Sequence, residues 1–337
     1  MESLIGKTLS ELKLLVHSFG MNTFTANQIS DWLYSKKVNS IDEMTNLSLV
    51  HRNKLKEKYQ VGRIAFFQKQ ASSDGTIKYL FPISGRPSVE CVFIPDKERA
   101  TLCVSSQVGC KMNCSFCMTG KQGFSGQLSA SDILNQILSI PETGRLTNVV
   151  FMGMGEPLDN TAELFKVLEI LTADYGFAWS PKRITVSTVG VIPGLQRFLS
   201  ERQEHLAVSL HSPYHEERMT LTPIEKTYPV SDIVNLVKQY DFSHQRRISF
   251  EYILFGGFND DQKHAEAVCQ LLKNLPCRVN LIKYHVIPGI DLPESDANAM
   301  IRFRDYLTAR GIICTIRASR GEDILAACGM LSSSKEN

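Results

Sequence analysis

Three cysteines stand close together in the segment Cys110-Lys-Met-Asn-Cys114-Ser-Phe-Cys117, a C-x₃-C-x₂-C spacing. Thiolates on one short loop can reach a single metal centre. A structural zinc site usually takes four protein ligands from pairs of C-x₂-C, and the sequence has no second pair. Three thiolates on a [4Fe–4S] cluster instead leave one iron without a protein ligand and free to bind a substrate molecule. The spacing favours such a cluster over a zinc site completed by a distant histidine, or over three unrelated core cysteines.

A second group of polar residues stands where β-rich runs are expected to end. Gly153-Met-Gly155-Glu156-Pro157 follows an expected strand at 148–152. Gly155 permits a close backbone approach, and the Glu156 carboxylate can accept a hydrogen bond from an ammonium group. Ser187 and the run Ser209-Leu210-His211 also follow expected strands, where helix capping is the alternative explanation.

Three further residues have types that invite chemistry. Glu90 lies among apolar neighbours in Val89-Glu90-Cys91-Val92, and a carboxylate there is costly unless it is paired or functional. Cys103 and Cys328 stand outside the triplet. A free cysteine is most often simply a buried residue, and that explanation is preferred for the remaining four: Cys91, Cys269, Cys277 and Cys314.

Composition excludes several classes of protein. The 337 residues include 37 Lys and Arg against 35 Asp and Glu, a balance that argues against a polybasic nucleic-acid binder. Residues 1–63 nevertheless hold nine basic against six acidic side chains, so positive charge is concentrated there. No apolar run approaches the ~18 residues of a membrane span, and the N-terminus lacks a secretory signal. We therefore expect a cytoplasmic protein that does not enter the membrane and whose cysteines are reduced.

The elements that must position these residues change character along the chain. Residues 1–61 carry helix signals, including three capping-box patterns at Thr8, Thr25 and Ser40. Residues 62–95 predict a small antiparallel sheet, with a hairpin formed by 63–67 and 77–81 around Asp74-Gly75 and a third strand at 89–94. From residue 96 to 331, β-rich runs alternate with amphipathic helices, which predicts a parallel sheet, open or closed into a full or partial barrel. The β-rich runs are 101–105, 148–152, 183–187, 205–210, 248–254, 278–284 and 312–317. Residues 332–337 form a polar tail.

These motifs together resemble a known family. The cysteine spacing, with Phe116 before its last cysteine, is similar to the radical S-adenosylmethionine (SAM) signature. The segments Ser105–Cys110, Met152–Pro157 and Arg320–Gly329 resemble more narrowly the RlmN group of the RlmN/Cfr family. This resemblance implies an α/β fold: a radical SAM partial (βα)6 TIM-like barrel with an N-terminal helical RNA-binding domain (1–61), a small linking antiparallel sheet (62–95) and a core (96–331) whose extension carries Cys328.

The resemblance also implies a role for each candidate residue. Cys110, Cys114 and Cys117 would hold the [4Fe–4S] cluster, and the SAM-binding positions match Gly155, Glu156, Ser187, Ser209, Leu210, His211 and His285. Cys328 would be methylated by one SAM, and a radical derived from a second SAM would activate that methyl group. Cys103 would resolve the resulting protein–RNA adduct through a transient disulfide with Cys328, and Glu90 would accept a proton or contact the base. His285 departs from the asparagine of the family.

The activity implied is methylation of adenosine C2 in 23S rRNA, at the peptidyl transferase centre, and in the tRNA anticodon loop. Carbon 2 of adenine is electron-poor and cannot attack the methyl group of SAM, whereas a carbon radical can add to it. A flavodoxin- or ferredoxin-type electron donor is implied as well. Cfr-like methylation of C8 is the alternative within the family, although Val108, Pro157 and Arg320-Gly321 favour C2. A non-catalytic, zinc-stabilised RNA-binding module is the alternative from another class.

Overall fold

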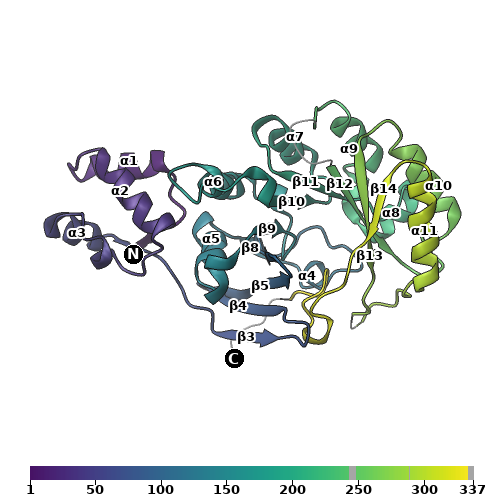
Figure 1. The fold of residues 1–337 in the computed structure, drawn as a ribbon, viewed down its shortest axis with the longest axis horizontal. Helices are drawn as coiled ribbons and strands as arrows, with labels where there is room; N and C mark the ends of the chain where they lie inside the picture. The colour runs from purple at the N-terminus through teal and green to yellow at the C-terminus, as the bar shows by residue number, and fades with distance from the viewer. Residues whose placement is uncertain (243–247, 288, 333–337) are drawn as a thin grey trace.

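A mixed sheet of ten strands organises the chain (Figure 1). The computed structural model describes residues 1–242, 248–287 and 289–332. The strand order is β14-β13-β12-β11-β10-β9-β6-β5-β4-β3, and pairing is parallel from β6 to β14. The parallel strands are β6 (Arg99–Cys103), β9 (Asn148–Phe151), β10 (Ile184–Thr188), β11 (His205–Ser209), β12 (Ile248–Leu254), β13 (Cys277–Lys283) and β14 (Ile313–Ile316). Each predicted β-rich run of the core overlaps one of them, with ends that differ by at most two residues.

Helices cover the outer face of these parallel strands, which makes this part of the chain a partial barrel (Figure 1). They are α5 (Ala130–Leu138), α6 (Thr161–Thr172), α7 (Ile192–Glu201), α8 (His215–Leu221), α9 (Val230–Val237), α10 (Gln262–Leu271) and α11 (Ala297–Ala309). Strand β12 explains the layering. Its apolar residues Phe250 and Tyr252 are fully buried in the main core, whereas Ser249 and Glu251, which alternate with them, line an interior cavity. The partial barrel predicted from the resemblance is confirmed.

The expected linking sheet is present but is not a separate unit. Strands β3 (Gln68–Ala71), β4 (Ile77–Ile83) and β5 (Arg86–Asp96) are antiparallel, and β5 continues onto β6 of the barrel. The first hairpin strand was predicted at 63–67 and lies instead at 68–71. Residues before it bond to α5, because Asn135 pairs with both backbone groups of Ile64, at 2.9 Å each.

The N-terminal helices form a lobe beside the barrel (Figure 1). They are α1 (Leu9–Ser18), α2 (Phe24–Ser30) and α3 (Leu49–Lys56), tied together by the short parallel pair β1 (Glu2–Ser3) and β2 (Tyr59–Gln60). The capping boxes at Thr8 and Ser40 are confirmed, although the second begins only a 3₁₀ turn. The prediction at Thr25 was wrong, since Thr25 is buried inside α2.

The lobe meets the barrel closely at α5. Gly6 has φ +89°, and a Cβ placed there would lie 2.6 Å from the Ser131 nitrogen. The Ser131 and Ser3 hydroxyls are 2.8 Å apart, and Arg63 bonds to the Leu138 carbonyl at the far end of α5. Within the described residues, every helix is too short or too polar to span a bilayer.

Candidate active site

A cavity of about 560 Å³ lies inside the partial barrel. Its wall includes residues of every parallel strand from β6 to β13, the cysteine loop and the end of the chain. Of the thirteen residues predicted to form the site, eleven line this cavity: the five cysteines Cys103, Cys110, Cys114, Cys117 and Cys328, together with Gly155, Glu156, Ser187, Ser209, His211 and His285. Glu90 and Leu210 do not.

The three clustered cysteines enter the cavity from one tight loop. A hairpin of β7 (Gln107–Gly109) and β8 (Phe124–Gln127) closes its base, where the Cys110 nitrogen donates to the Gly123 carbonyl at 2.9 Å. Cys117 begins the short helix α4 (Met118–Lys121). Burial raises the pKa of Cys110 to about 12, and burial together with the neighbouring thiols raises the pKa of Cys114. Without a cationic partner the loop therefore favours neutral thiols.

This donor set fits an iron–sulfur cluster. Within the described part of the chain, no three Cys, His, Asp or Glu side chains are placed to hold a metal ion between them. A zinc site completed by a distant histidine therefore has no ligand set there. A cluster binds each thiolate on a separate iron, so its three sulfurs need not meet at one point. The positive charge of the irons would favour the thiolate form that burial opposes.

Glu156 lies at the end of β9, where the chain turns sharply. Gly155 has φ +97°, and a Cβ there would lie 2.4 Å from the Gln107 Cβ. The Glu156 carboxylate accepts hydrogen bonds from the Leu158 and Val189 nitrogens at 3.0 and 2.9 Å. Burial nevertheless raises its pKa from 4.5 to about 7. A buried carboxyl group with this pKa gains most from a cationic ligand.

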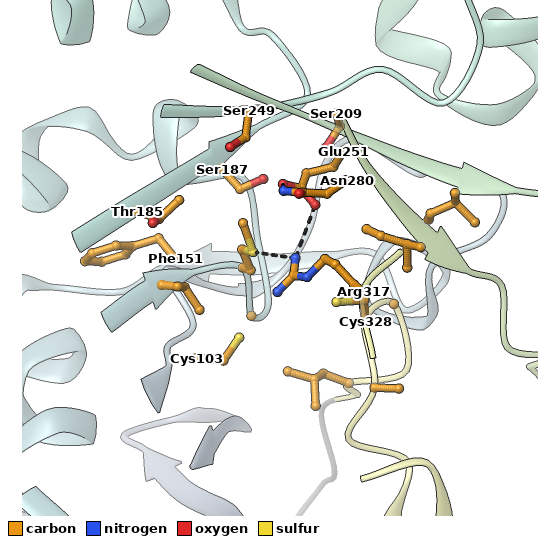
Figure 2. Close-up of a pocket in the computed structure, with 18 of the residues that line it drawn as sticks. Cys103, Phe151, Thr185, Ser187, Ser209, Ser249, Glu251, Asn280, Arg317 and Cys328 are labelled. Atoms are coloured by element: carbon orange, nitrogen blue, oxygen red, sulfur yellow. Dashed lines mark hydrogen bonds and ion pairs between the residues drawn. The ribbon is translucent and has the colours of Figure 1, made fainter. Parts of the chain in front are cut away.

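Ser187 and Ser209 face the cavity from β10 and β11, as Figure 2 shows. His211 follows in a left-handed conformation, φ +57°, and its Nδ1 accepts from the Ile253 nitrogen at 3.1 Å. Burial, with a contribution from Arg218, lowers its pKa to about 3, so the ring is neutral. Its ring packs edge-on against Phe116 of the cysteine loop, with ring centroids 4.8 Å apart.

Arg218 of α8 explains why Leu210 points elsewhere. The Leu210 side chain is fully buried in the main core, and its carbonyl accepts from Arg218 Nε at 2.9 Å. The same guanidinium, itself 0% exposed, bonds to the Ser209 and Val189 carbonyls and to the Glu225 carboxylate. It thereby fixes the ends of β10 and β11 behind the cavity.

His285, two residues after β13, also lines the cavity. Its Nε2 lies 2.8 Å from the Ser319 hydroxyl and its Nδ1 lies 3.6 Å from the Glu322 carboxylate. Burial lowers its pKa, opposed by Glu322. Because both ring nitrogens have partners in the C-terminal part of the chain, the histidine joins β13 to that part.

The cavity also contains the two cysteines outside the triplet, as Figure 2 shows. Cys103, at the end of β6, is buried, whereas Cys328 is exposed. Arg317 lies beside Cys328, and its Nη1 is 3.2 Å from the Glu251 carboxylate and 3.6 Å from the Met152 sulfur. Burial works against its charge, but Glu251 raises the pKa of Arg317 and keeps it protonated. The three clustered cysteines, Cys103 and Cys328 are all unbridged thiols in the structure.

Glu90 lies under the C-terminal end of the chain instead of in the cavity wall. Its Oε1 is 3.1 Å from Lys78 Nζ, and its Oε2 accepts from the Ser332 nitrogen at 3.0 Å. Burial raises the pKa of Glu90, opposed by Lys78. The sequence predicted that this carboxylate is either paired or functional, and the structure provides the partner.

Sequence reasoning missed three cavity residues on neighbouring strands: Glu251, Asn280 and Arg317. Asn280 donates to Glu251 Oε1 at 2.7 Å and accepts from Thr315 at 2.8 Å, so the three form one polar layer across β12, β13 and β14. A usable signal was present in the sequence. Glu251 and Asn280 each stand between two apolar residues of a predicted strand, and a polar side chain at such a position faces an interior space or a partner.

Comparison with known proteins agrees with this geometry. A family model described as the radical SAM superfamily matches residues 104–268, and one described as the ribosomal RNA large subunit methyltransferase N-terminal domain matches residues 3–61. A solved radical SAM methyltransferase from Sphaerobacter thermophilus superimposes with a TM-score of 0.92 at 36% identity, covering 98% of this chain and 99% of its own.

Curated relatives match over almost the whole chain. A probable dual-specificity RNA methyltransferase RlmN from Parabacteroides distasonis is 60% identical over 332 residues, 98% of this chain and 97% of its own. The dual-specificity RNA methyltransferase RlmN of Marinobacter nauticus is 38% identical over 339 residues, 98% of this chain and 92% of its own. The alternative of a non-catalytic zinc-stabilised module is therefore wrong. The chain belongs to the RlmN family of radical SAM RNA methyltransferases, enzymes that use a [4Fe–4S] cluster and S-adenosylmethionine.

Proposed function

We propose that this enzyme methylates C2 of adenosine in 23S rRNA, at the peptidyl transferase centre, and in the anticodon loop of tRNA. One observation carries the proposal: Cys103 and Cys328 share a single cavity with the cysteine loop. A methyltransferase that moved the SAM methyl group directly to a nucleophile would need neither thiol. The printed names of the relatives, dual-specificity RNA methyltransferases, support two RNA substrates.

The cavity residues divide into a cofactor side and a transfer side. Cys110, Cys114 and Cys117 would hold the cluster, and Glu156 would accept a hydrogen bond from the SAM ammonium group. When bound, the cluster and SAM supply one-electron cleavage of a carbon–sulfur bond and so radical chemistry. Ser187, Ser209 and neutral His211 complete the SAM-binding wall, and His285 reaches it from β13.

On the transfer side, Cys328 carries the methyl group and Cys103 completes the cycle. The Cys328 sulfur would receive a methyl group from one SAM and lose its thiol proton. A radical derived from a second SAM would remove one hydrogen atom from that methyl group, and the methylene radical left on sulfur would bond to adenine C2. Cys103 would then form a transient disulfide with Cys328 as the bond between the Cys328 sulfur and the methylene carbon breaks; that carbon takes up a proton to become the new methyl group, and the C2 proton and one electron leave the adduct. The exposure of Cys328 suits a thiol that meets both SAM and RNA, and the burial of Cys103 suits one that acts only inside the cavity.

The RNA must present its adenine as an unstacked base, since the cavity lies inside the barrel. We propose that residues 1–61 form the phosphate-binding domain, that 62–95 link it to the core, and that 96–331 form the catalytic core. The match of residues 3–61 to a ribosomal RNA methyltransferase domain supports this division. The electron comes from a flavodoxin- or ferredoxin-type protein, and the reduced thiols suit the cytoplasm.

Nucleoside analysis tests the proposal directly. The cluster-loaded enzyme is incubated anaerobically with SAM, a reductant and either 23S rRNA or tRNA, and the digested RNA is analysed by mass spectrometry against nucleoside standards. We expect 2-methyladenosine from both RNAs. Formation of 8-methyladenosine would refute the position proposed, and product from only one RNA would refute dual specificity.

A further inference from the structure

The chain end that carries Cys328 is held on two sides. We define residues 321–332 as the C-terminal segment. On one side the Met118 nitrogen donates to the Gly329 carbonyl at 2.8 Å, and the Thr119 hydroxyl donates to the Leu331 carbonyl at 2.7 Å. Both donors belong to α4, directly after the cysteine loop. One edge of the C-terminal segment is therefore bonded to the element that follows the cluster ligands.

The other side rests on β4 and β5. Leu80 lies opposite Glu90 in the antiparallel register, and Lys78 lies opposite Val92, so Lys78 and Glu90 are diagonal neighbours on one face of the sheet. Their side chains are only 7% and 5% exposed, and Lys78 Nζ lies 3.1 Å from Glu90 Oε1. A buried ion pair has formed between the two strands.

Each member of this pair also bonds to the backbone of the C-terminal segment. Lys78 Nζ donates to the Leu325 carbonyl at 3.5 Å, and Glu90 Oε2 accepts from the Ser332 nitrogen at 3.0 Å. Cys328 lies between these two points, three residues after Leu325 and four before Ser332. The pair therefore grips the chain on both sides of the thiol.

The free-energy cost of burying two charges indicates that the pair serves to bind the C-terminal segment and not to stabilise the fold. Removing two charges from water costs several kcal/mol per ion, and apolar residues of similar volume often stabilise a protein equally well or better. An ion pair at this position is thus a poor device for stability. Unlike apolar residues, the pair supplies a donor and an acceptor for two backbone groups of a segment whose helical structure is limited to the short 3₁₀ turn Glu322–Ile324.

We propose that Lys78 and Glu90 are positioning residues, which hold the Cys328 thiol in the cavity by fixing the C-terminal segment at Leu325 and Ser332. Neither side chain lines the cavity, and both Glu90 carboxylate oxygens are occupied. The contacts with Lys78 and Ser332 are a role for Glu90 distinct from the proton-accepting or base-contacting role that the resemblance implies. It rests on the proposed function of Cys328.

Hydrogen exchange tests the grip separately from catalysis. The double variant Lys78→Met/Glu90→Leu replaces the pair by apolar residues of similar size, so it should fold. Lys78→Arg keeps the charge, and Lys69→Met, at an exposed position on neighbouring β3, is the control. In the cluster-loaded enzyme, we expect amides of residues 325–332 to exchange about tenfold faster in the double variant. Exchange should be close to wild type in Lys78→Arg and unchanged in Lys69→Met.

Catalysis should follow the exchange result. In the double variant we expect kcat to fall while KM for RNA stays constant, because the RNA-binding surface is untouched. Wild-type exchange of residues 325–332 in the folded double variant would overturn the proposal. A different result would show that the proposed function itself is wrong. In that case Cys328→Ala would still methylate RNA, whatever the exchange rates of residues 325–332.

Discussion

At the scale of single residues, two charged groups of the cavity differ in how far neighbouring groups compensate their charge. Arg317 already has a counter-ion, Glu251, at 3.2 Å. Glu156 receives two backbone N–H groups and has a pKa near 7, so its negative charge is only partly satisfied before a ligand binds. The difference matches the positions of the two groups: Arg317 stands beside a thiol, and Glu156 stands where a cation is expected.

The first prediction concerns the pH dependence of stability through Glu156. Its folded-state pKa of about 7 exceeds its ordinary value of 4.5, so the folded protein binds more protons than the unfolded chain between these pH values. Stability from the neutral carboxyl group is therefore present below pH 4.5 and lost as the pH rises through 7. Without SAM, the free energy of unfolding of the wild type should fall from pH 5 to pH 8 by up to about 3 kcal/mol relative to Glu156→Gln.

Anaerobic urea unfolding at both pH values measures that difference. The comparison uses the change with pH in each protein, since the glutamine variant also loses a hydrogen-bond acceptor for one backbone nitrogen. Parallel pH profiles for the two proteins would contradict the raised pKa of Glu156.

The second prediction separates the two cysteines outside the triplet. Cys328→Ala should assemble its cluster normally, because Cys328 is not a ligand, and should form no methylated base. Cys103→Ala should still accept a methyl group on Cys328 but should accumulate RNA covalently bound to the protein. Iron content, peptide mass spectrometry and a denaturing gel report these three properties. Methylated RNA from Cys328→Ala would disprove the assigned role, and Cys269→Ala, on α10 outside the cavity, is the matched control.

At the scale of elements, the ends of the parallel strands and the turns that follow them carry most of the candidate site residues in the cavity. The partial barrel was predictable because its strands and helices follow regular apolar patterns over short stretches of chain. The site was predictable where a motif is local, as in the cysteine loop. Partners far apart in sequence were not: Lys78 and Leu325 are separated by 247 positions, and no local pattern joins them. For the same reason, the sequence did not predict the hydrogen bonds between Asn135 and the backbone of Ile64. Because of these bonds, the first hairpin strand begins at residue 68 and not at 63.

A third prediction tests the turn after β9. Gly155→Ala places a methyl group against Gln107 in a left-handed conformation, which costs about 1–2 kcal/mol from strain alone. Gly257→Ala is the control, since Gly257 has φ +68° and open space around its Cβ position. We expect the Gly155 variant to lose more stability than the control and to bind SAM at least about tenfold more weakly, as Glu156 shifts. Equal unfolding midpoints and equal SAM affinities would show that the close approach is unimportant.

At the scale of the whole molecule, the N-terminal lobe contacts the barrel at both ends of α5. Gly6 touches Ser131, and Arg63 and Ile64 bond to the other end of the same helix. The net positive charge of the chain lies in this lobe. If the lobe binds phosphates as proposed, these contacts with the barrel would give the bound phosphates a defined distance from the cavity, so the lobe would orient an RNA as well as attract it.

The fourth prediction concerns this charge. Reversing Lys54, Lys56 and Lys58 to glutamate should weaken RNA binding and reduce the slope of log Kd against log salt by roughly 0.7 for each single-strand phosphate that the lysines no longer neutralise. Part of the effect on Lys56 is structural, because it pairs with Asp42 at 2.6 Å. The control reverses Lys226, Lys263 and Lys273, exposed lysines on the barrel. Equal affinities and slopes for the two triple variants would place the RNA elsewhere.

The grip on the C-terminal segment also sets an order of events during synthesis. Domains fold from the N-terminus as the ribosome adds about 5–20 residues per second. The ribosome adds Lys78 247 residues before Leu325. The C-terminal segment that covers β4 and β5 is therefore synthesised roughly 12–50 s after them. Cys328 enters the cavity only when almost the whole chain has been made. On the proposed function, a chain terminated before residue 328 would have its cluster ligands and β4 and β5 but would lack the thiol that carries the methyl group.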